Sequence, residues 1–321
     1  MQSRLLAVTL AAACSTGAAC AAPAEAAVDT AAPPSVIKVV FVIAMENQDA
    51  RDIYGNTTSA PYINNVLLPT YAHSTNFTDE LPPAIPSEPH YVWMEAGTNQ
   101  FSDHTFTGDG DATAVNSTAS KLHLATQIRK AGLTWMAYQE GINATTGACP
   151  ISSSGHYAAK HDPFVFFQDV SGSPPSKTTK GCAARHKDTS ALAADLANHA
   201  VASYNFITPN LCNDMHGDTG CADGNYIRAG DKWLQANLPA IIDYANANAG
   251  AIFITWDESE STTYMPFIAI GPHVKAGYAG SVNYTHSAML RSMEEILQLA
   301  PLKTVKSATD FKDLFVAGYF P

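Results

Sequence analysis

The stretch VVFVIAMENQD, residues 39–49, decides the fold. Its first part, residues 39–44, is apolar and rich in β-branched residues, which is typical of a strand buried on both faces of a sheet. The strand leads directly to Glu46 and Asn47, with no turn residue between. An uncompensated buried carboxylate costs several kcal/mol, so it normally has a cation, a proton or hydrogen-bond donors beside it. The pair therefore marks a candidate site, and a surface loop that happens to begin with Glu is the alternative.

Four more segments have the composition of buried strands. They are residues 132–141, 204–208, 251–256 and 266–271. Helical apolar spacing occurs around residues 122–130 and in residues 190–199, 230–245 and 287–299. Alternation of strands and helices predicts an α/β fold: a three-layer α/β/α sandwich whose central sheet is mostly parallel.

Polar side chains follow several of these strands. In an open α/β sheet, sites gather at the carboxyl ends of the strands. The residues that we expect to meet there with Glu46 and Asn47 are Asn210, Asp214, His216, Asp257, Glu258 and His286. Carboxylate and amide oxygens suit one divalent cation such as Ca²⁺, Mg²⁺ or Mn²⁺, and Zn²⁺ if a histidine joins them.

A nucleophile is expected in ELPPAIPSEPHYVWMEAGTN, residues 80–99. Ser87 lies in a Pro-rich turn just before an apolar, helix-like segment. The free N–H groups and the positive dipole end of a helix start suit a serine that attacks a phosphate. The alternative is that Ser87 is only the N-cap of that helix.

The charge of the chain limits its partners. The 321 residues carry a formal net charge of -11. An acidic surface argues against nucleic acid and against electrostatic attachment to anionic membranes. An anionic substrate would need a local positive centre, which a metal ion would supply. The sequence carries no signal for an oligomeric state.

The N-terminus predicts export. Arg4 precedes an apolar run and several small-residue cleavage options, the pattern of a signal peptide over residues 1–27. We expect a secreted or periplasmic protein with a single catalytic domain over residues 28–321. No second apolar run is long enough to form a transmembrane segment.

Four cysteines remain after the predicted signal: Cys149, Cys182, Cys212 and Cys221. An even count in an exported chain predicts two disulfides. Among three possible pairings we favour Cys149–Cys182 and Cys212–Cys221, since each closes a polar loop. A zinc site is the alternative, and the absence of a C-x-x-C pair argues against it.

Seven ordered blocks resemble the phosphoesterase family of secreted acid phosphatases and bacterial phospholipases C, within the alkaline-phosphatase-like superfamily. They are VVFVIAMENQDARDIYG, PSEPHYVWMEAG, GLTWMAYQEG, YAAKHDPFVFF, YNFITPNLCNDMHG, FITWDES and YTHSAMLRSMEEILQL. The resemblance covers most of the mature chain. It implies an alkaline-phosphatase-like fold and a small phosphorylated substrate.

The resemblance also implies roles for residues. Glu46, Asn47, Asp257 and Glu258 would surround one metal that Ser87 faces as the nucleophile. His216 and His286 would flank the phosphoryl group as donors or as acid/base groups. Substrate-binding roles are implied for Lys160, His161, Asn210 and Asp214.

The sequence departs from the family pattern at three places. The first motif reads ENQDARD where many relatives carry ENRSFDH. His90 stands where relatives often have Asn. Glu258 replaces what is usually a His in the wider superfamily, which argues for one metal rather than two.

The implied activity is that of an exported, metal-dependent phosphomonoesterase of acid-phosphatase type, acting through a phosphoserine intermediate. A phosphodiesterase or phospholipase C acting on phospholipid head groups is the alternative with the same chemistry. A non-catalytic protein that binds a phosphate ligand is the alternative from another class.

Overall fold

The computed structural model describes residues 36–82, 84–142 and 147–321. The expected signal peptide, residues 1–27, lies outside these ranges. The described residues form one compact unit. No helix among the described residues is long and apolar enough to cross a membrane.

An eight-stranded sheet runs through this unit in the order β4-β3-β5-β1-β6-β7-β2-β8. Its strands are β1 (Val39–Met45), β2 (Ala72–Thr78), β3 (Trp135–Gln139), β4 (His186–Lys187), β5 (Tyr204–Thr208), β6 (Gly250–Trp256), β7 (Tyr264–Ile270) and β8 (Ala279–Gly280). The pairs from β4 to β6 are all parallel, whereas β7 pairs antiparallel with both β6 and β2. The predicted α/β fold with a mostly parallel sheet is confirmed.

The five predicted strands are all present, and the sequence missed β2, β4 and β8. Strand β2 reads AHSTNFT, with buried and partly exposed positions mixed, so it lacks the continuous apolar run of β1. Strands β4 and β8 have two residues each, which is too short for any periodic pattern.

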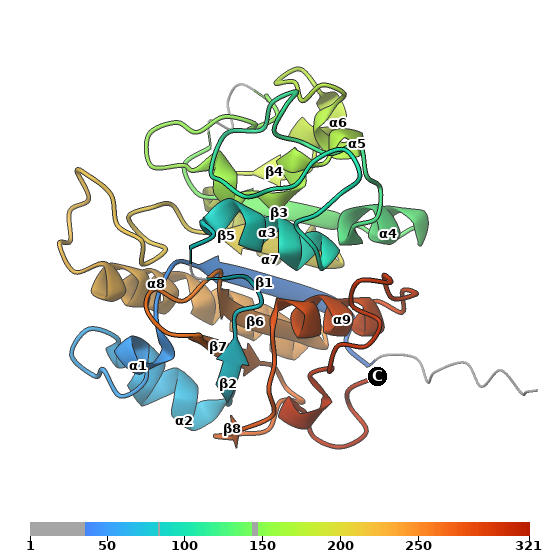
Figure 1. Cartoon of the computed structure of the whole chain (residues 1–321). Coiled ribbons are helices and arrows are strands. Elements are labelled where there is room, and N and C mark those ends of the chain that lie inside the picture. The colour runs from blue at the N-terminus through green and yellow to red at the C-terminus, as the bar shows by residue number, and fades with distance from the viewer. Residues whose placement is uncertain (1–35, 83, 143–146) are drawn as a thin grey trace, which may run out of the picture. The chain divides into compact units, whose positions relative to one another are not determined.

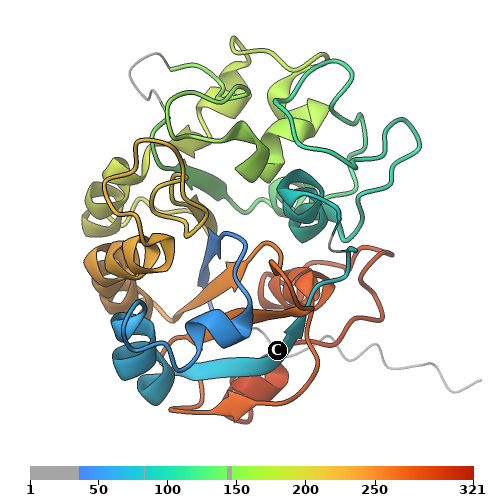
Figure 2. The ribbon, with the colours of Figure 1, turned by 60° about the vertical axis from the view of Figure 1, so that its left-hand side comes forward.

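Helices cover both faces of the sheet. The α-helices are α1 (Ala50–Ile53), α2 (Leu68–Thr70), α3 (Ser87–Ala96), α4 (Leu124–Lys130), α5 (Gln168–Ser171), α6 (Lys180–Ala183), α7 (Leu192–Ala197), α8 (Tyr226–Ala247) and α9 (His286–Ile296). Helices α7 and α8 lie on one face, and α3 and α9 lie side by side on the other (Figures 1 and 2). This arrangement is the predicted three-layer sandwich.

The apolar face of α8 explains how the layer formed by α7 and α8 is held against the sheet. Trp233, Leu234, Leu238 and Ile241 are buried at helical spacing. Burial of one such aliphatic side chain stabilises the fold by about 1.5–3 kcal/mol. Strand β1, which α8 helps to cover, is buried along its whole length. The central strands are therefore fixed, and the polar residues at their carboxyl ends are held in place.

Two disulfides join Cys149 to Cys182 and Cys212 to Cys221. The favoured pairing is confirmed, and the zinc alternative for these four cysteines is wrong. The first bridge lies in the long connection between β3 and β4, and the second lies in the loop between β5 and α8. The second closes the loop that carries Asp214 and His216.

Candidate active site

Strands β1 and β6 bring four predicted site residues together. They pair in parallel with Met45 opposite Trp256, so Glu46–Asn47 and Asp257–Glu258 leave the sheet side by side. The backbone N–H of Asn47 donates to Asp257 Oδ1 at 3.1 Å. The Asn47 side-chain amide donates to Glu258 Oε1 at 3.2 Å. The two strand ends therefore form one cluster of oxygen atoms.

Helix α3 supplies the serine. Its N-cap is Pro86 and Ser87 is its first residue, so the Ser87 side chain does not serve as the cap. The helix ends at Gly97, whose φ of 63° and close approach to Val305 both require glycine. At the other end of α3, the contacts of Ser87 with Glu46 and Glu258 place the helix start over the carboxyl ends of β1 and β6.

Ser87 is buried between two carboxyl groups. Its Oγ lies 3.2 Å from Glu46 Oε2 and 3.3 Å from Glu258 Oε1. A hydroxyl has one hydrogen, so it can donate to only one of the two at a time. The other carboxyl group needs a proton or a cation beside it. The arrangement is therefore incomplete without a positive charge near Ser87.

The raised pKa values of the carboxyl groups in this cluster also indicate that a positive charge is needed near Ser87. Burial raises the pKa of Glu46 and of Asp257, and neighbouring carboxylates raise both further. Burial also raises the pKa of Glu258, to about 7. Asn47 Oδ1 and Asp257 Oδ2 are buried and have no hydrogen-bond partner among the described residues. A divalent cation bound to these oxygens would satisfy them and stabilise the ionised carboxylates.

A second group lies on the other side of Glu46. His161 Nε2 is 3.4 Å from Glu46 Oε1, and His161 Nδ1 is 3.7 Å from Asp214 Oδ2. Burial lowers the pKa of His161 well below its usual value, and the nearby Lys160 and His216 lower it further. Glu46, His161 and Asp214 lie close enough together to hold a cation. Sequence reasoning named all three residues but did not predict that they form one group.

Lys160 carries a positive charge near the site. Its Nζ pairs with Asp109 Oδ2 at 2.5 Å, and Asp109 Oδ1 accepts the backbone N–H of Glu88 at 3.0 Å. Lys160 is half-buried, with 21% of its side chain exposed. Its ammonium group acts electrostatically on Glu46 and on Asp257. Lys160 is therefore placed where it can neutralise part of the charge of a phosphate.

The loop after β5 holds the remaining predicted residues. His216 is exposed, and its Nδ1 donates to the carbonyl of Gly217 at 2.7 Å. The backbone N–H of His216 donates to Asp214 Oδ1 at 2.8 Å. Asn210 Oδ1 accepts the backbone N–H of Cys212 at 3.0 Å, so this oxygen shapes the loop. His216 is thus the accessible polar group, and Asp214 is the buried one.

His286 begins α9 and is buried. Its Nε2 donates to the carbonyl of Asp257 at 2.6 Å, which ties the helix start to the end of β6. Burial lowers the pKa of His286 to about 4, so the ring is neutral at pH 7. Its Nδ1 is buried and has no hydrogen-bond partner in the described structure. A neutral ring of this kind can accept a hydrogen bond or bind a cation through Nδ1.

Sequence reasoning missed Tyr91, and it noted His90 without assigning it a role. Tyr91 Oη donates to Glu46 Oε1 at 2.5 Å, and His90 Nε2 lies 3.7 Å from Glu258 Oε2. Both follow Ser87 on the same helix. The spacing of four between Ser87 and Tyr91 is the signal that could have found Tyr91, because residues four apart share a helix face.

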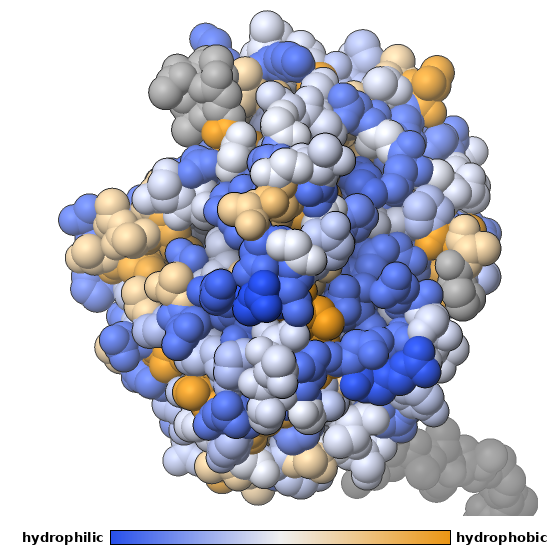
Figure 3. Space-filling model, turned by 90° about the vertical axis from the view of Figure 1, so that its left-hand side faces the viewer, coloured by the Kyte–Doolittle hydropathy of each residue, from blue (hydrophilic) through white to orange (hydrophobic). Residues whose placement is uncertain are grey.

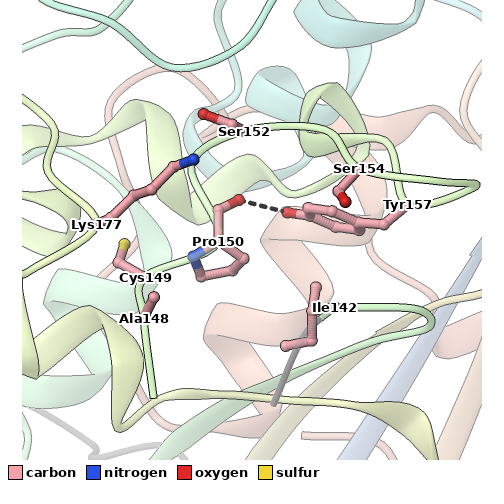
Figure 4. Close-up of a pocket in the computed structure, with 8 residues that line it drawn as sticks. All are labelled: Ile142, Ala148, Cys149, Pro150, Ser152, Ser154, Tyr157 and Lys177. Carbon is pink, nitrogen blue, oxygen red and sulfur yellow. Dashed lines mark hydrogen bonds between the residues drawn. The ribbon is translucent and has the colours of Figure 1, made fainter. Parts of the chain in front are cut away.

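A separate pocket of about 230 Å³ lies beside the first disulfide (Figure 4). Tyr157 donates across it to the carbonyl of Pro150 at 2.7 Å. Lys177 is its charged lining residue, and its lining contains no carboxylate. This pocket therefore lacks the acid groups of the Ser87 cluster.

Comparison with known proteins decides the family. The model of the Phosphoesterase family matches residues 71–300. The chain belongs to the Phosphoesterase family. This match contains Ser87, Asp257, Glu258 and His286, and begins after Glu46. The predicted resemblance is confirmed.

Curated relatives are named as phosphatases. The chain is 29% identical over 284 residues to a phosphatidylinositol-3-phosphatase of Mycobacterium tuberculosis, covering 88% of this chain and 84% of that protein. It is 26% identical to a phosphate-repressible acid phosphatase of Penicillium chrysogenum, covering 65% of this chain and 48% of that protein. Together with the family match, these names support a hydrolase acting on phosphoric ester bonds.

Solved structures confirm the fold. A protein of the alkaline phosphatase superfamily from Vibrio parahaemolyticus has a TM-score of 0.53 at 9% identity, covering 85% of this chain and 70% of that chain. Murine ectonucleotide pyrophosphatase/phosphodiesterase 5 has a TM-score of 0.55 at 10% identity, covering 87% and 100%. The alkaline-phosphatase-like fold is therefore confirmed.

Proposed function

We propose that this chain is an exported, metal-dependent phosphomonoesterase that acts through a phosphoserine intermediate at Ser87. The observation that carries the proposal is the position of Ser87. It is the first residue of α3, and its Oγ lies within hydrogen-bond distance of both Glu46 and Glu258. A serine held in this way has a base beside it and a helix N-terminus behind it.

The residues fit one divalent cation. Glu46, Asn47, Asp257 and Glu258 would hold it with oxygen atoms, two of which have no other partner among the described residues. When bound, such an ion polarises a phosphoryl oxygen and lowers the pKa of a nearby hydroxyl. The ion is Ca²⁺, Mg²⁺, Mn²⁺ or Zn²⁺ on the basis of this ligand set.

The residues of the chain then carry out a double displacement. Ser87 Oγ attacks phosphorus while its proton passes to Glu46 or Glu258, and the bond to the leaving alkoxide breaks. The alkoxide takes up a proton and leaves as the alcohol. Water then attacks the phosphoserine, inorganic phosphate leaves, and the Ser87 oxygen regains a proton. Positioning and charge stabilisation supply most of the rate.

Other side chains would bind the phosphoryl group. Lys160 supplies positive charge, and the exposed His216 is the accessible group for proton transfer to the leaving oxygen. His286 holds the Asp257 backbone through Nε2, and its buried Nδ1 has no hydrogen-bond partner among the described residues. His161 lies between Glu46 and Asp214. Asn210 shapes the loop after β5.

The substrate is proposed to be a phosphate monoester, because the curated relatives are named as phosphatases. The Mycobacterium tuberculosis relative, which is matched over 84% of its length, makes the phosphorylated head group of an inositol lipid a second candidate. Figure 3 views the side toward which β1 points in Figure 1. This face is mostly hydrophilic, with small apolar patches, which favours a soluble ester over a substrate held in a membrane. Export is supported by the two disulfides.

One assay separates the alternatives. Purified mature protein is given p-nitrophenyl phosphate, bis-p-nitrophenyl phosphate and phosphatidylinositol 3-phosphate in vesicles. We expect the monoester to be preferred over the diester. A preference for the diester would support the phosphodiesterase or phospholipase C alternative, and binding of phosphate without turnover would support a binding protein.

Ser87→Ala tests the nucleophile. We expect turnover to be abolished while the fold survives, because only one buried oxygen is removed. Ser171→Ala is the matched control, since Ser171 of α5 is also buried but donates to the Phe167 carbonyl. Full activity of Ser87→Ala would contradict the assignment.

A further inference from the structure

We infer that Tyr91 is a positioning residue for the Glu46 carboxylate, holding one of its oxygens so that the other faces Ser87. The inference rests on the proposed function, since it concerns how the same site is kept ready to bind a cation. In the sequence, the spacing of four from Ser87 places Tyr91 on the same helix face but does not show what its hydroxyl contacts. The structure does so through its contacts.

Helix α3 contacts both oxygens of Glu46. Tyr91 Oη donates to Oε1 at 2.5 Å, and Ser87 Oγ lies 3.2 Å from Oε2. The two residues are one helical turn apart on the same face of α3. A rotation of the Glu46 carboxylate would break both contacts together. One rigid helix therefore sets the orientation of the carboxylate and the position of the nucleophile.

Packing prevents the Tyr91 ring from moving. The ring is fully buried and stacks on His161, with centroids 5.0 Å apart and planes 11° apart. Its edge meets Phe206 of β5 at 6.3 Å and 71°. His161 in turn lies 3.4 Å from the Glu46 oxygen that Tyr91 holds. Oε1 thus accepts the Tyr91 hydroxyl with the His161 ring beside it, and Oε2 is the oxygen that faces Ser87.

A purely structural role would predict a different outcome. A buried phenol needs a hydrogen-bond acceptor, and its loss ordinarily changes stability alone. A hydroxyl that orients a metal ligand changes metal affinity, typically by about 10–100-fold when it is removed. Metal affinity therefore separates the two roles without reference to activity.

The experiment compares two hydroxyl deletions in the metal-stripped full-length mature protein. Tyr91→Phe keeps the ring that stacks on His161 and removes only the hydroxyl. Tyr138→Phe is the matched control, because Tyr138 is also fully buried and donates to a carboxylate, Asp195, at 2.7 Å. Mn²⁺ is titrated into each protein by calorimetry, and circular dichroism checks that each is folded. We expect Tyr91→Phe to bind Mn²⁺ about 10–100-fold more weakly than the wild type, and Tyr138→Phe to bind it as the wild type does.

The outcomes separate this inference from the proposed function. If the wild type binds Mn²⁺ and hydrolyses the monoester, and folded Tyr91→Phe binds Mn²⁺ as tightly, the inference alone is overturned. If both variants lose affinity equally, the effect is general and the inference is also overturned. A wild type that binds no Mn²⁺ and turns over no ester overturns the proposed function, and the inference with it.

Discussion

His90 Nδ1 lies 3.1 Å from Asp79 Oδ1, and both side chains are buried. The other ring nitrogen of His90 is 3.2 Å from the Ile85 carbonyl and 3.7 Å from Glu258 Oε2. Burial lowers the pKa of His90, but Asp79, Asp257 and Glu258 raise it by more, to about 9. His90 is therefore an imidazolium at pH 7, and it links the end of β2 to the site.

Replacement of His90 by Asn should destabilise the protein. His90→Asn leaves the Asp79 carboxylate buried without its partner, which costs about 3–5 kcal/mol of unfolding free energy. Urea denaturation at pH 7 measures the loss. Asp79→Asn alone is the second single variant. The double variant, with both His90 and Asp79 replaced by Asn, should recover part of the stability because neither charge is then unpaired. Two single variants whose effects simply add would contradict a coupled pair.

Asp257→Asn should weaken metal binding. The amide keeps an oxygen that can accept the backbone N–H of Asn47, which lies 3.1 Å from Asp257 Oδ1 in the wild type. The substitution removes the negative charge that a cation would bind. Elemental analysis after dialysis should find less bound metal than in the wild type, and turnover should fall with it. Asp231→Asn is the control, because Asp231 is a buried carboxylate that only accepts the N–H groups of Tyr62 and Ile63. Unchanged metal content in Asp257→Asn would contradict the site.

The sequence predicted best those site residues that directly follow an apolar strand. Glu46 follows seven apolar residues and Asp257 follows the most apolar strand, so local pattern alone places both at a sheet edge. Their adjacency needed the β1–β6 pairing, in which residues 211 apart hydrogen-bond to each other. No local pattern records which strands are neighbours.

Tyr91 and Asp109 show why the rest could not be predicted. Tyr91 sits in an apolar helix where a tyrosine is ordinarily core; its spacing from Ser87 gives the helix face, but its contact with Glu46 is seen only in the structure. Asp109 lies in a loop without periodicity, and its contact with Lys160 depends on how two long loops fold back on the sheet. Such contacts are set by tertiary packing.

Loss of the two disulfides should separate stability from activity. The Cys149–Cys182 bridge spans 33 residues of separation and Cys212–Cys221 spans 9. Loop-closure entropy makes the longer bridge worth roughly 4 kcal/mol and the shorter one roughly 3 kcal/mol. Replacement of Cys149 and Cys182 by Ala should therefore lower the urea midpoint more than replacement of Cys212 and Cys221 by Ala. The shorter bridge closes the Asp214–His216 loop, so its removal should reduce turnover more. The prediction is contradicted if the variant that loses more stability is also the one that loses more turnover.

His123 joins three helices in a buried charge network away from Ser87. Its Nε2 lies 2.8 Å from Asp169 Oδ1 of α5, and its Nδ1 lies 3.7 Å from Glu95 Oε2 of α3. Burial lowers the pKa of His123, but Asp169 and Glu95 raise it by more, so the net shift is upward. Burial raises the pKa of Asp169, but His123, Thr126 and Arg129 lower it by more, so the net shift is downward.

These two shifts set a pH window for stability. The raised pKa of His123 means that its contribution is fully present below about pH 6.5 and is lost as the pH rises through its folded-state value. The lowered pKa of Asp169 means that its contribution is fully present above about pH 3.9 and is lost as the pH falls through its folded-state value. Both contributions are complete between about pH 4 and 6.5.

His123→Gln should therefore lower the unfolding free energy most in that window, by roughly 3–5 kcal/mol, because the buried Glu95 loses its charged partner and Asp169 keeps only Arg129 as a charged partner. Urea unfolding of the variant and the wild type across pH 4–9 measures the difference, which should shrink as the pH rises past the window. His156→Gln is the matched control, since His156 lies 2.9 Å from Asp218 in a partly exposed pair that water screens. A difference for His123→Gln that grows steadily toward pH 9 would show that the ring is neutral in the folded protein and would contradict the network.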